Sequence, residues 1–529
     1  MAPHVDRRAW RPPRRVCDSR LLVLLACILG SAVVFIDTTV VNVALPALRS
    51  DLGAGLSGQQ WVVDAYLLTL GSLVLLGGSL GDLLGRRRVF AIGVGGFGLA
   101  SALCALAPSI GVLIALRAVQ GVFAALLVPS SLAIITATHD GPARGAAIGA
   151  WTAWTSAAVA FGPPLGGVLV DSLSWRAVFA MNVPLVLATL WLIHRAIPAF
   201  PGRDQRLDLL GGVLCALGLA GPVLGLIEEP LRGWGDPLVI GSLAAGTALL
   251  AAFVAHERRS SEPMLPLGLF AVRDFAVANA ATVAIYAGLG ALTFLVAVYL
   301  QQIAGYSATA AGLSLMPVTV MLVAFSRRFG ALSARIGPRR VMGLGPLVAA
   351  AGALLFLRLG PRVDYLTDLL PAAALFGLGM SATVAPLTAT VLSATEPGQA
   401  GIASGVNNAL ARVASLIAIA LVGLVVSFRF TGVLDAKLTR AHLSPGQRAL
   451  VGAVRARPLT RPEGASPALS AAATAASVSA FRYGIGAAAL LIGCGGAIAL
   501  AGLSSRPPRG GGAPTSRPGS DPAAVQAWT

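Results

Sequence analysis

The sequence predicts an all-α polytopic membrane protein, and two observations lead to that fold class. Of its 529 residues, 56% are hydrophobic and 12% are charged, and the charged share is about half that of an average soluble domain. The hydrophobic residues also fall into separate runs of about 18 to 25 residues, each long enough to cross ~30 Å of hydrocarbon as a helix. A soluble protein with a single buried core does not need so many long apolar runs.

Fourteen such runs follow one another, with Arg, Gly and Pro between them. Basic residues precede the first run, as in a secretory signal, but no small-residue cleavage site ends it, so an uncleaved helix is the better interpretation. An even number of spans places both chain ends on one side of the membrane. We expect the helices near residues 21–45, 59–80, 89–107, 110–136, 145–170, 178–196, 208–228, 238–256, 275–300, 308–327, 341–358, 366–392, 402–427 and 481–503.

The distribution of charge predicts on which side of the membrane the two chain ends lie. The formal net charge is +17, from 39 Lys and Arg against 22 Asp and Glu. Such a balance could indicate nucleic acid, but most of the basic residues lie in alternate connections between the apolar runs, a pattern typical of cytoplasmic loops. The loop at about 428–480 is an exception, since it is basic and lies on the opposite side, but long loops cross the membrane largely regardless of charge. We therefore expect a multi-pass protein of the plasma (inner) membrane with both termini in the cytoplasm and no nucleic-acid partner. The pattern rests on Arg86, Arg87, Arg88, Arg144, Arg195, Arg203, Arg206, Arg258, Arg259, Arg273, Arg327, Arg328, Arg335, Arg339, Arg340, Arg506, Arg509 and Arg517.

Two similar segments indicate that the chain consists of two related halves. Segments 78–88 and 330–340 each carry two glycines seven residues apart and end on arginines. Both lie between apolar runs, as in proteins built from repeats around a central path. The external loop and the tail, rich in Pro, Ser and Gly or Ala, are expected to be flexible, although the start of the loop could form an amphipathic helix. The predicted parts are a basic cytoplasmic N-terminus (1–20), an N-terminal six-helix bundle (21–200), two linker helices (201–260), a C-terminal six-helix bundle (261–503) with an external loop at about 428–480, and a cytoplasmic tail (504–529).

Ordered motifs follow one another in the first half. They are DTTVVNVALP at 37–46, GSLGDLLGRRR at 78–88, RAVQG at 117–121 and GPPLGG at 162–167. In this order they resemble the major facilitator superfamily, in particular its fourteen-helix drug/proton antiporters. The resemblance implies the major-facilitator fold, with two six-helix bundles and two inserted helices. The chain departs from the family pattern at Phe123, Ala158 and Ala334.

Ionisable groups inside predicted spans are candidate site residues, because an uncompensated charge is expensive in hydrocarbon. Asp37 is a candidate proton carrier or anchor for a cationic substrate, the alternative being a structural hydrogen bond. Asp64 could share protons or be merely solvated near a helix end. Arg117 could control proton release from a nearby carboxylate or form a structural ion pair, and Arg412 could contact substrate or only another helix. The family resemblance adds Asn42 and Gln120 through its motifs at 37–46 and 117–121. The predicted proton-coupling and substrate-binding set is therefore Asp37, Asn42, Asp64, Arg117, Gln120 and Arg412.

Two glycine-containing motifs are candidate moving parts. In the first, Asp82 beside three arginines can form a charge-assisted latch, although membrane topology alone would also explain the arginines. In the second, glycine and proline remove side chains and a backbone donor from a helix interior, which allows a hinge or only close packing. The predicted gating loop is Gly78, Asp82, Gly85, Arg86, Arg87 and Arg88, and the predicted hinge is Gly162, Pro163, Gly166 and Gly167.

The sequence contains no pattern typical of an enzyme, a metal site or a nucleotide-driven pump. The five histidines fall in predicted loops or at helix ends, the five cysteines lack CxxC spacing, and no GxxxxGK[ST] run occurs. We expect no cofactor and a proton gradient as the energy source. The predicted function is a monomeric, bilayer-embedded antiporter that exchanges protons for lipophilic, often cationic drugs or toxic small molecules. The alternatives are a dedicated exporter of one endogenous metabolite or antibiotic, and a non-transporting receptor or scaffold.

Overall fold

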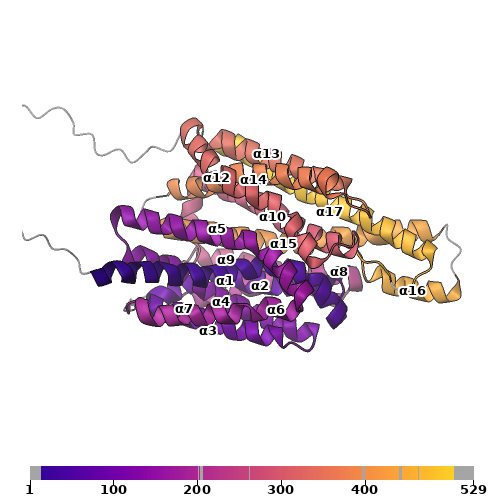
Figure 1. Cartoon of the computed structure of the whole chain (residues 1–529), viewed down its shortest axis with the longest axis horizontal. Coiled ribbons are helices and arrows are strands. Elements are labelled where there is room, and N and C mark those ends of the chain that lie inside the picture. Colours follow the sequence, from indigo (N-terminus) through magenta and orange to yellow (C-terminus); the bar gives the residue numbers. More distant parts are fainter. Residues whose placement is uncertain are drawn as a thin grey trace, which may run out of the picture.

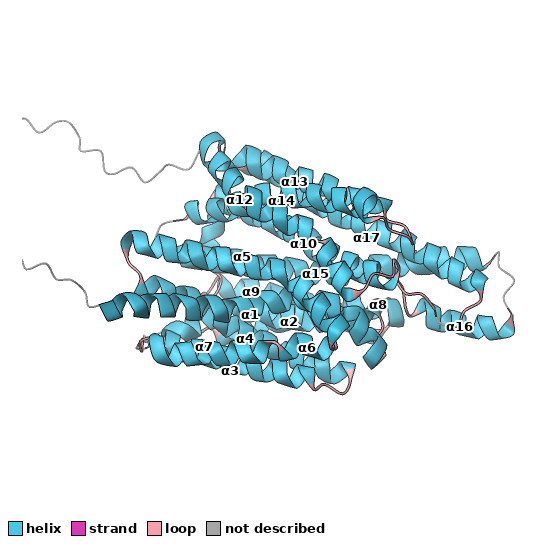
Figure 2. Cartoon of the chain, viewed as in Figure 1, coloured by secondary structure: helices cyan, strands magenta, loops and turns pink. Residues whose placement is uncertain are grey.

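The computed structural model of the protein describes residues 14–200, 202, 207–260, 263–395, 400–439, 444–462 and 464–504. In these residues the regular structure is helical, and fourteen helical segments are long and apolar enough to cross a membrane (Figures 1 and 2). The predicted fold class and number of spans are therefore confirmed. Most of the predicted N-terminal segment and nearly all of the predicted tail lie outside the described residues, as do Arg203, Arg206, Arg506, Arg509 and Arg517.

Residues 14–200, called the N half from here on, form six spans. The last span is broken at Met181 into two helices, and the helices pack chiefly as the pairs α2 with α4, α1 with α5 and α3 with α4. The bounds are α1 (Arg14–Leu52), α2 (Leu56–Leu84), α3 (Arg86–Ala105), α4 (Ile110–Thr138), α5 (Gly141–Ser172), α6 (Trp175–Ala180) and α7 (Asn182–Ala196).

Two linker helices, α8 (Leu209–Arg232) and α9 (Pro237–Glu257), pack on each other, and α8 also contacts α2 and α15. Residues 263–504, called the C half, form the remaining six spans. One span is interrupted at Leu315, just before Pro317. The elements of the C half are η1 (Leu267–Ala271), α10 (Arg273–Gln302), α11 (Ala308–Ser314), α12 (Met316–Ile336), α13 (Pro338–Leu355), η2 (Phe356–Arg358), η3 (Tyr365–Leu369), α14 (Leu370–Ser393), α15 (Ala400–Leu438), α16 (Pro445–Arg455) and α17 (Pro467–Gly502).

The two repeated segments have matching backbone geometry. Gly85 ends α2 with φ +93°, and Gly337 ends α12 with φ +89°. Glycine occupies these positions because a side chain is strained in that region of φ. Space is also limited at Gly85, where an added Cβ would overlap the carbonyl oxygen of Phe200. The shared geometry is what two related halves should have at corresponding turns.

The segment expected to be a flexible external loop, about residues 428–480, is mostly helical where the structure describes it. A helix is present at its start, as the sequence allowed, but the flexibility expected of the rest was wrong. α15 continues to Leu438, α16 follows, and α17 begins at Pro467. The cause is a stripe of apolar residues at helical spacing, buried where α15 and α17 pack together. The high content of Ala, Pro, Ser and Arg concealed this stripe in the sequence. Its fully buried members are Phe430, Leu434, Leu469, Ala473, Ala476 and Ala480.

The two halves are joined near one end of the molecule. We call it the loop end, where α16 lies, and the other the terminal end, where α1 begins and α17 finishes (Figure 1). Gln302 donates to the side-chain oxygen of Gln59 at 3.1 Å. The Asp171 carboxylate accepts the backbone amides of Ala308 and Thr309 at 3.1 and 2.8 Å. In the part of the chain that the structure describes, the hydrogen bonds between the halves all lie toward the loop end.

Candidate functional site

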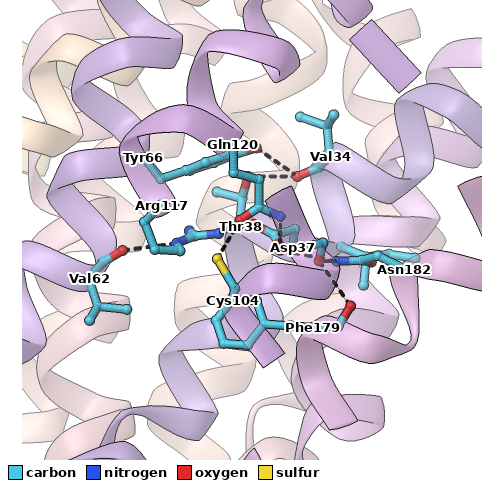
Figure 3. Close-up of polar contacts among 12 residues, drawn as sticks. Val34, Asp37, Thr38, Val62, Tyr66, Cys104, Arg117, Gln120, Phe179 and Asn182 are labelled. Atoms are coloured by element: carbon cyan, nitrogen blue, oxygen red, sulfur yellow. Dashed lines mark hydrogen bonds and ion pairs between the residues drawn. The ribbon is translucent and has the colours of Figure 1, made fainter. Parts of the chain in front are cut away.

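A buried ion pair lies inside the N half. Asp37 on α1 is 0% exposed and Arg117 on α4 is 1% exposed, and their Oδ2 and Nη1 atoms are 2.6 Å apart (Figure 3). Both residues lie within membrane spans, and their burial keeps both charges away from water. A pair in this position is stable only if the remaining donors and acceptors are also satisfied.

Amide side chains complete the surroundings of Asp37. Gln120 lies three residues after Arg117, on the same face of α4, and donates from Nε2 to Asp37 Oδ1 at 3.1 Å. Its own Oε1 accepts from Arg117 Nη1 at 2.7 Å. Asn182, at the start of α7, donates to Asp37 Oδ1 at 3.2 Å. Both carboxylate oxygens therefore have donors, and three helices meet at this side chain.

The guanidinium of Arg117 is also held by α2. Its Nε donates to the Val62 carbonyl at 3.0 Å, and its Cζ lies 4.2 Å from the centre of the Tyr66 ring. The close approach of α2 and α4 depends on Gly121, where an added Cβ would overlap the Tyr66 carbonyl oxygen. The RAVQG motif thus supplies the cation, the amide and the space that the pair needs.

A second layer holds Asn182 in place. Its amide donates to the Ser101 hydroxyl of α3 at 2.9 Å, and that hydroxyl donates to the Phe179 carbonyl of α6 at 2.9 Å. We call Asp37, Arg117, Gln120, Asn182 and Ser101 the buried network. It connects α1, α3, α4, α6 and α7. A change in the charge of Asp37 would therefore alter hydrogen bonds that link most helices of the N half.

Asp64 is buried separately from this network. It is 0% exposed on α2, and neither of its carboxylate oxygens has a hydrogen-bond partner among the described residues. An ionised carboxylate without a donor or a cation is very expensive at such a position. A protonated carboxyl group avoids most of that cost, so this residue is chemically suited to hold a proton.

Asn42 and Arg412 also lie outside the buried network. The side-chain oxygen of Asn42 has no hydrogen-bond partner among the described residues. Arg412, on α15 of the C half, places its Cζ 5.4 Å from the centre of the Phe35 ring of α1. The predicted set is therefore divided: the structure brings Asp37, Arg117 and Gln120 together and leaves the other three residues apart.

The predicted gating loop ties helices of the N half together at the terminal end. Arg86 binds the Asp82 carboxylate through Nε and Nη2, both at 2.8 Å, and donates from Nη1 to the Ala133 carbonyl of α4 at 3.1 Å. Arg87 donates to the His194 carbonyl of α7 at 3.3 Å. These contacts connect α2, α3, α4 and α7.

The remaining members of that loop have simpler surroundings. Gly78 faces Pro129 of α4, with 3.6 Å between an added Cβ and the proline Cβ. Gly85 supplies the left-handed turn described above. Arg88 is exposed.

The predicted hinge on α5 packs against both halves. A Cβ added at Gly162 or Gly166 would overlap side chains of α1, and one added at Gly167 would overlap the backbone of α11 in the C half. In return, Gly312 of α11 lies directly against the Pro163 carbonyl. Small residues therefore let α5 contact its neighbours at the level where the halves join.

The chain matches a known protein family over most of its transmembrane region. The model of the family described as Major Facilitator Superfamily matches residues 27–419. The chain belongs to the major facilitator superfamily. This membership confirms the predicted family and the prediction of a transporter rather than an enzyme.

Several characterised members of the superfamily are similar to this chain over most of its length. The puromycin resistance protein pur8 of Streptomyces alboniger is 40% identical, over 77% of this chain and 81% of that protein. The multidrug resistance protein Stp of Mycobacterium tuberculosis is 34% identical, over 81% and 80%. The tetracenomycin C resistance and export protein of Streptomyces glaucescens is 33% identical, with 79% and 78% covered.

Solved structures with the major-facilitator fold are also similar. A bacterial homologue of the human lysosomal transporter Spinster gives a TM-score of 0.61 at 18% identity, with 92% of this chain and 99% of that chain covered. A structure from work on proton-dependent oligopeptide transporters gives 0.58 at 14% identity, with 92% and 98% covered. At these identities the similarity shows the fold alone.

Sequence reasoning missed two members of the buried network. Asn182 lies in the segment WRAVFAMNVP at 175–184, which also resembles the superfamily, but it was not expected to contact Asp37, and Ser101 was not singled out. The available signal was a polar side chain inside an apolar run, since buried polar groups normally have partners. That signal indicates that a partner exists but does not identify it.

Proposed function

We propose that this superfamily member is a proton-coupled antiporter that exports lipophilic small molecules, antibiotics among them, by alternating access. The relatives described above are named for drug resistance or export, and they match this chain along most of its length. The observation that carries the proposed proton coupling is the Asp37–Arg117 pair, enclosed and bonded at 2.6 Å. The stability of a pair buried so deeply depends on the charge of each partner. The simplest change in that charge is the binding of a proton to Asp37.

Protonation of Asp37 would weaken the buried network at its centre. The neutral carboxyl group would no longer attract Arg117, which would keep the Gln120 oxygen and the Val62 carbonyl as acceptors. α1 would then be held less tightly to α4, and the N half could change its packing. Asp64 adds a second titratable group, which can gain or lose a proton without breaking a hydrogen bond to the described residues.

The substrates are proposed to share lipophilicity rather than positive charge. The expectation of cationic substrates relied on Asp37 as an anchor. In the structure Asp37 already accepts hydrogen bonds from Arg117, Gln120 and Asn182. A cationic substrate would have to displace Arg117, so cations are proposed only as compounds able to compete with that pair.

The proposed setting is the plasma membrane, with the terminal end facing the cytoplasm. This orientation follows from the arginine-rich connections at that end, including Arg86, Arg87 and Arg88. Protons, the lipid bilayer and the substrate are the proposed partners of a monomer. On this orientation the joined loop end faces outward.

Transport in inside-out vesicles tests the proposal. Radiolabelled puromycin and a panel of other lipophilic drugs are offered with and without an imposed pH gradient, using wild type and Asp37→Asn. We expect gradient-driven uptake by wild type that a proton ionophore abolishes and that Asp37→Asn lacks. An equal rate of uptake with and without the pH gradient would exclude proton coupling. Transport of only one compound of the panel would favour a dedicated exporter. If no compound is transported, a receptor or scaffold would be favoured.

A further inference from the structure

Arg412 is placed where a charge is expensive. It lies about 10 residues after the start of the span Ile402–Leu438, or ~15 Å at 1.5 Å per residue, near the middle of a hydrocarbon core. The side chain is half-buried. It faces the other half of the molecule, with the ring of Phe35 5.4 Å from its Cζ. Tyr66 of α2 and Tyr286 of α10 lie within electrostatic range of the guanidinium.

This guanidinium has no acceptor among the described residues. No described carboxylate forms an ion pair with it, and it donates no hydrogen bond to a described group. Arg117 is different, because Asp37, Gln120 and Val62 take up its donors. Since Asp37 is committed to Arg117, the described residues leave the charge of Arg412 uncompensated.

We propose that Arg412 recognises an acidic group of the transported molecule, so that the substrates include amphiphilic organic acids. The carboxylate binds the guanidinium, and the apolar or aromatic body lies beside Phe35 and Tyr286. The inference deepens the proposed export function and rests on it for the statement that the bound molecule is a substrate.

The chemistry of arginine favours a carboxylate here. A guanidinium is planar, always charged, and presents a fork of N–H donors that matches two carboxylate oxygens. An aromatic ring that covers one face of the fork leaves the donors in the plane free for a ligand. Partial burial strengthens such a bond, because water competes less for the donors.

The position of Arg412 also relates binding to conformation. Its guanidinium belongs to the C half and Phe35 to the N half, so a molecule whose acid binds the guanidinium and whose body lies beside Phe35 contacts both halves. A movement that separates the halves would remove one side of that site. Affinity for the acid should therefore differ between conformations, as alternating access requires.

Equilibrium binding to the purified full-length protein in lipid nanodiscs tests the proposal. The probes are dansylglycine and its primary amide, which share a ring system and differ in the carboxylate. Arg412→Gln should weaken dansylglycine binding about 10-fold or more while the amide changes less than about twofold, as for loss of a charge-assisted pair. Arg412→Lys keeps the charge but not the fork and should give an intermediate loss.

Arg429 provides a matched control on the same helix. It also stacks on an aromatic ring, with its Cζ 4.2 Å from the centre of the Tyr483 ring, and it donates to Ser479 at 3.0 Å. Arg429→Gln should bind both probes like wild type. Retained binding of the amide to Arg412→Gln shows that the variant is folded.

Three results would overturn the inference: no binding of dansylglycine to wild type, an equal loss of acid and amide in Arg412→Gln, or displacement of dansylglycine by chloride at equal ionic strength, which would mark a site for inorganic anions. Because binding needs no pH gradient, the assay gives its answer even if proton-driven export fails.

Discussion

Arg117 and Asp37 are 80 residues apart in the sequence and form an ion pair at 2.6 Å with almost no exposed surface. Each partner has additional hydrogen bonds, from Gln120 and Asn182 to the carboxylate and from Arg117 to the Val62 carbonyl. These bonds offset part of the cost of removing two charges from water. The two charges therefore compensate each other, and removing one of them should lower the stability of the protein more than removing both.

The first prediction concerns that balance. Asp37→Asn leaves the Arg117 charge buried without a counter-charge, and the variant should lose about 3–5 kcal/mol of stability. The double variant Asp37→Asn/Arg117→Gln removes both charges and should recover much of that loss while remaining inactive in transport. Thermal unfolding of the purified proteins and vesicle transport measure the two effects. Equal stability of the single and double variants would contradict a coupled pair.

The second prediction separates Asp64 from the buried network. Asp64→Asn keeps the shape of the side chain and removes no hydrogen bond to a described residue. We expect wild-type thermal stability and loss of pH-gradient-driven transport, with substrate counterflow retained. Counterflow needs alternating access but no net proton movement, so it reports on folding and rocking alone. Full gradient-driven transport by this variant would exclude Asp64 as a proton carrier.

A third prediction concerns the contact between α5 and α11. Gly167→Ala adds a methyl group that overlaps the backbone at Ala308 and Thr309 and should keep the loop end from closing. Transport should fall by about 10-fold or more, as for a barrier raised by ~1.4 kcal/mol or more. Gly149→Ala, on the same helix with open space around it, is the control and should transport normally. Equal activity of the two variants would show that close packing at Gly167 is dispensable.

A fourth prediction is that the stability of the protein depends on pH through Asp208, which lies at the start of α8 beside His256 in the last turn of α9. Burial opposes ionisation of Asp208, but hydrogen bonds from the Gly211 amide at 2.8 Å and from His256 at 2.7 Å outweigh it and hold the pKa of that carboxyl below its usual range. A lowered folded-state pKa stabilises the protein above the unfolded value of about 3.9, and the contribution is lost as pH falls through the folded value.

Thermal unfolding of Asp208→Asn across pH tests that reasoning. The variant should unfold at a lower temperature than wild type at pH 7, and the difference should narrow at pH values below about 4. A difference that is constant from neutral to acidic pH would show that ionisation of Asp208 contributes nothing. Asp236→Asn, another helix cap whose carboxylate accepts from the Leu238 amide at 2.8 Å, is a control without a histidine bonded to the carboxylate.

The buried network shows where sequence reasoning succeeds and where it stops. Asp37 and Arg117 were predicted as site residues because charged groups inside apolar runs need a reason to be there, and Gln120 because it belongs to the RAVQG motif of the family resemblance. Their pairing, and the parts played by Asn182 and Ser101, depend on contacts between helices distant in the sequence. A single sequence records the polar groups but not the distances between them.

The external segment illustrates the same limit in the fold. Its composition predicted flexibility, whereas α15 and α17 continue through it because each covers the apolar stripe of the other. Neither helix alone has a strong reason to extend so far from the membrane. Packing between two parts of the chain decided the structure, and local composition could not report it.

By itself the sequence determined the helical class and the fourteen spans, because the bilayer fixes how long an apolar run must be and each run satisfies that condition alone. The tertiary structure decided that Asp37 is committed to Arg117, while Asp64 and Arg412 have no hydrogen-bond or ion-pair partner among the described residues. The physical reason is that the cost of a buried charge depends on atoms within a few ångströms, and in this protein those atoms come from other helices.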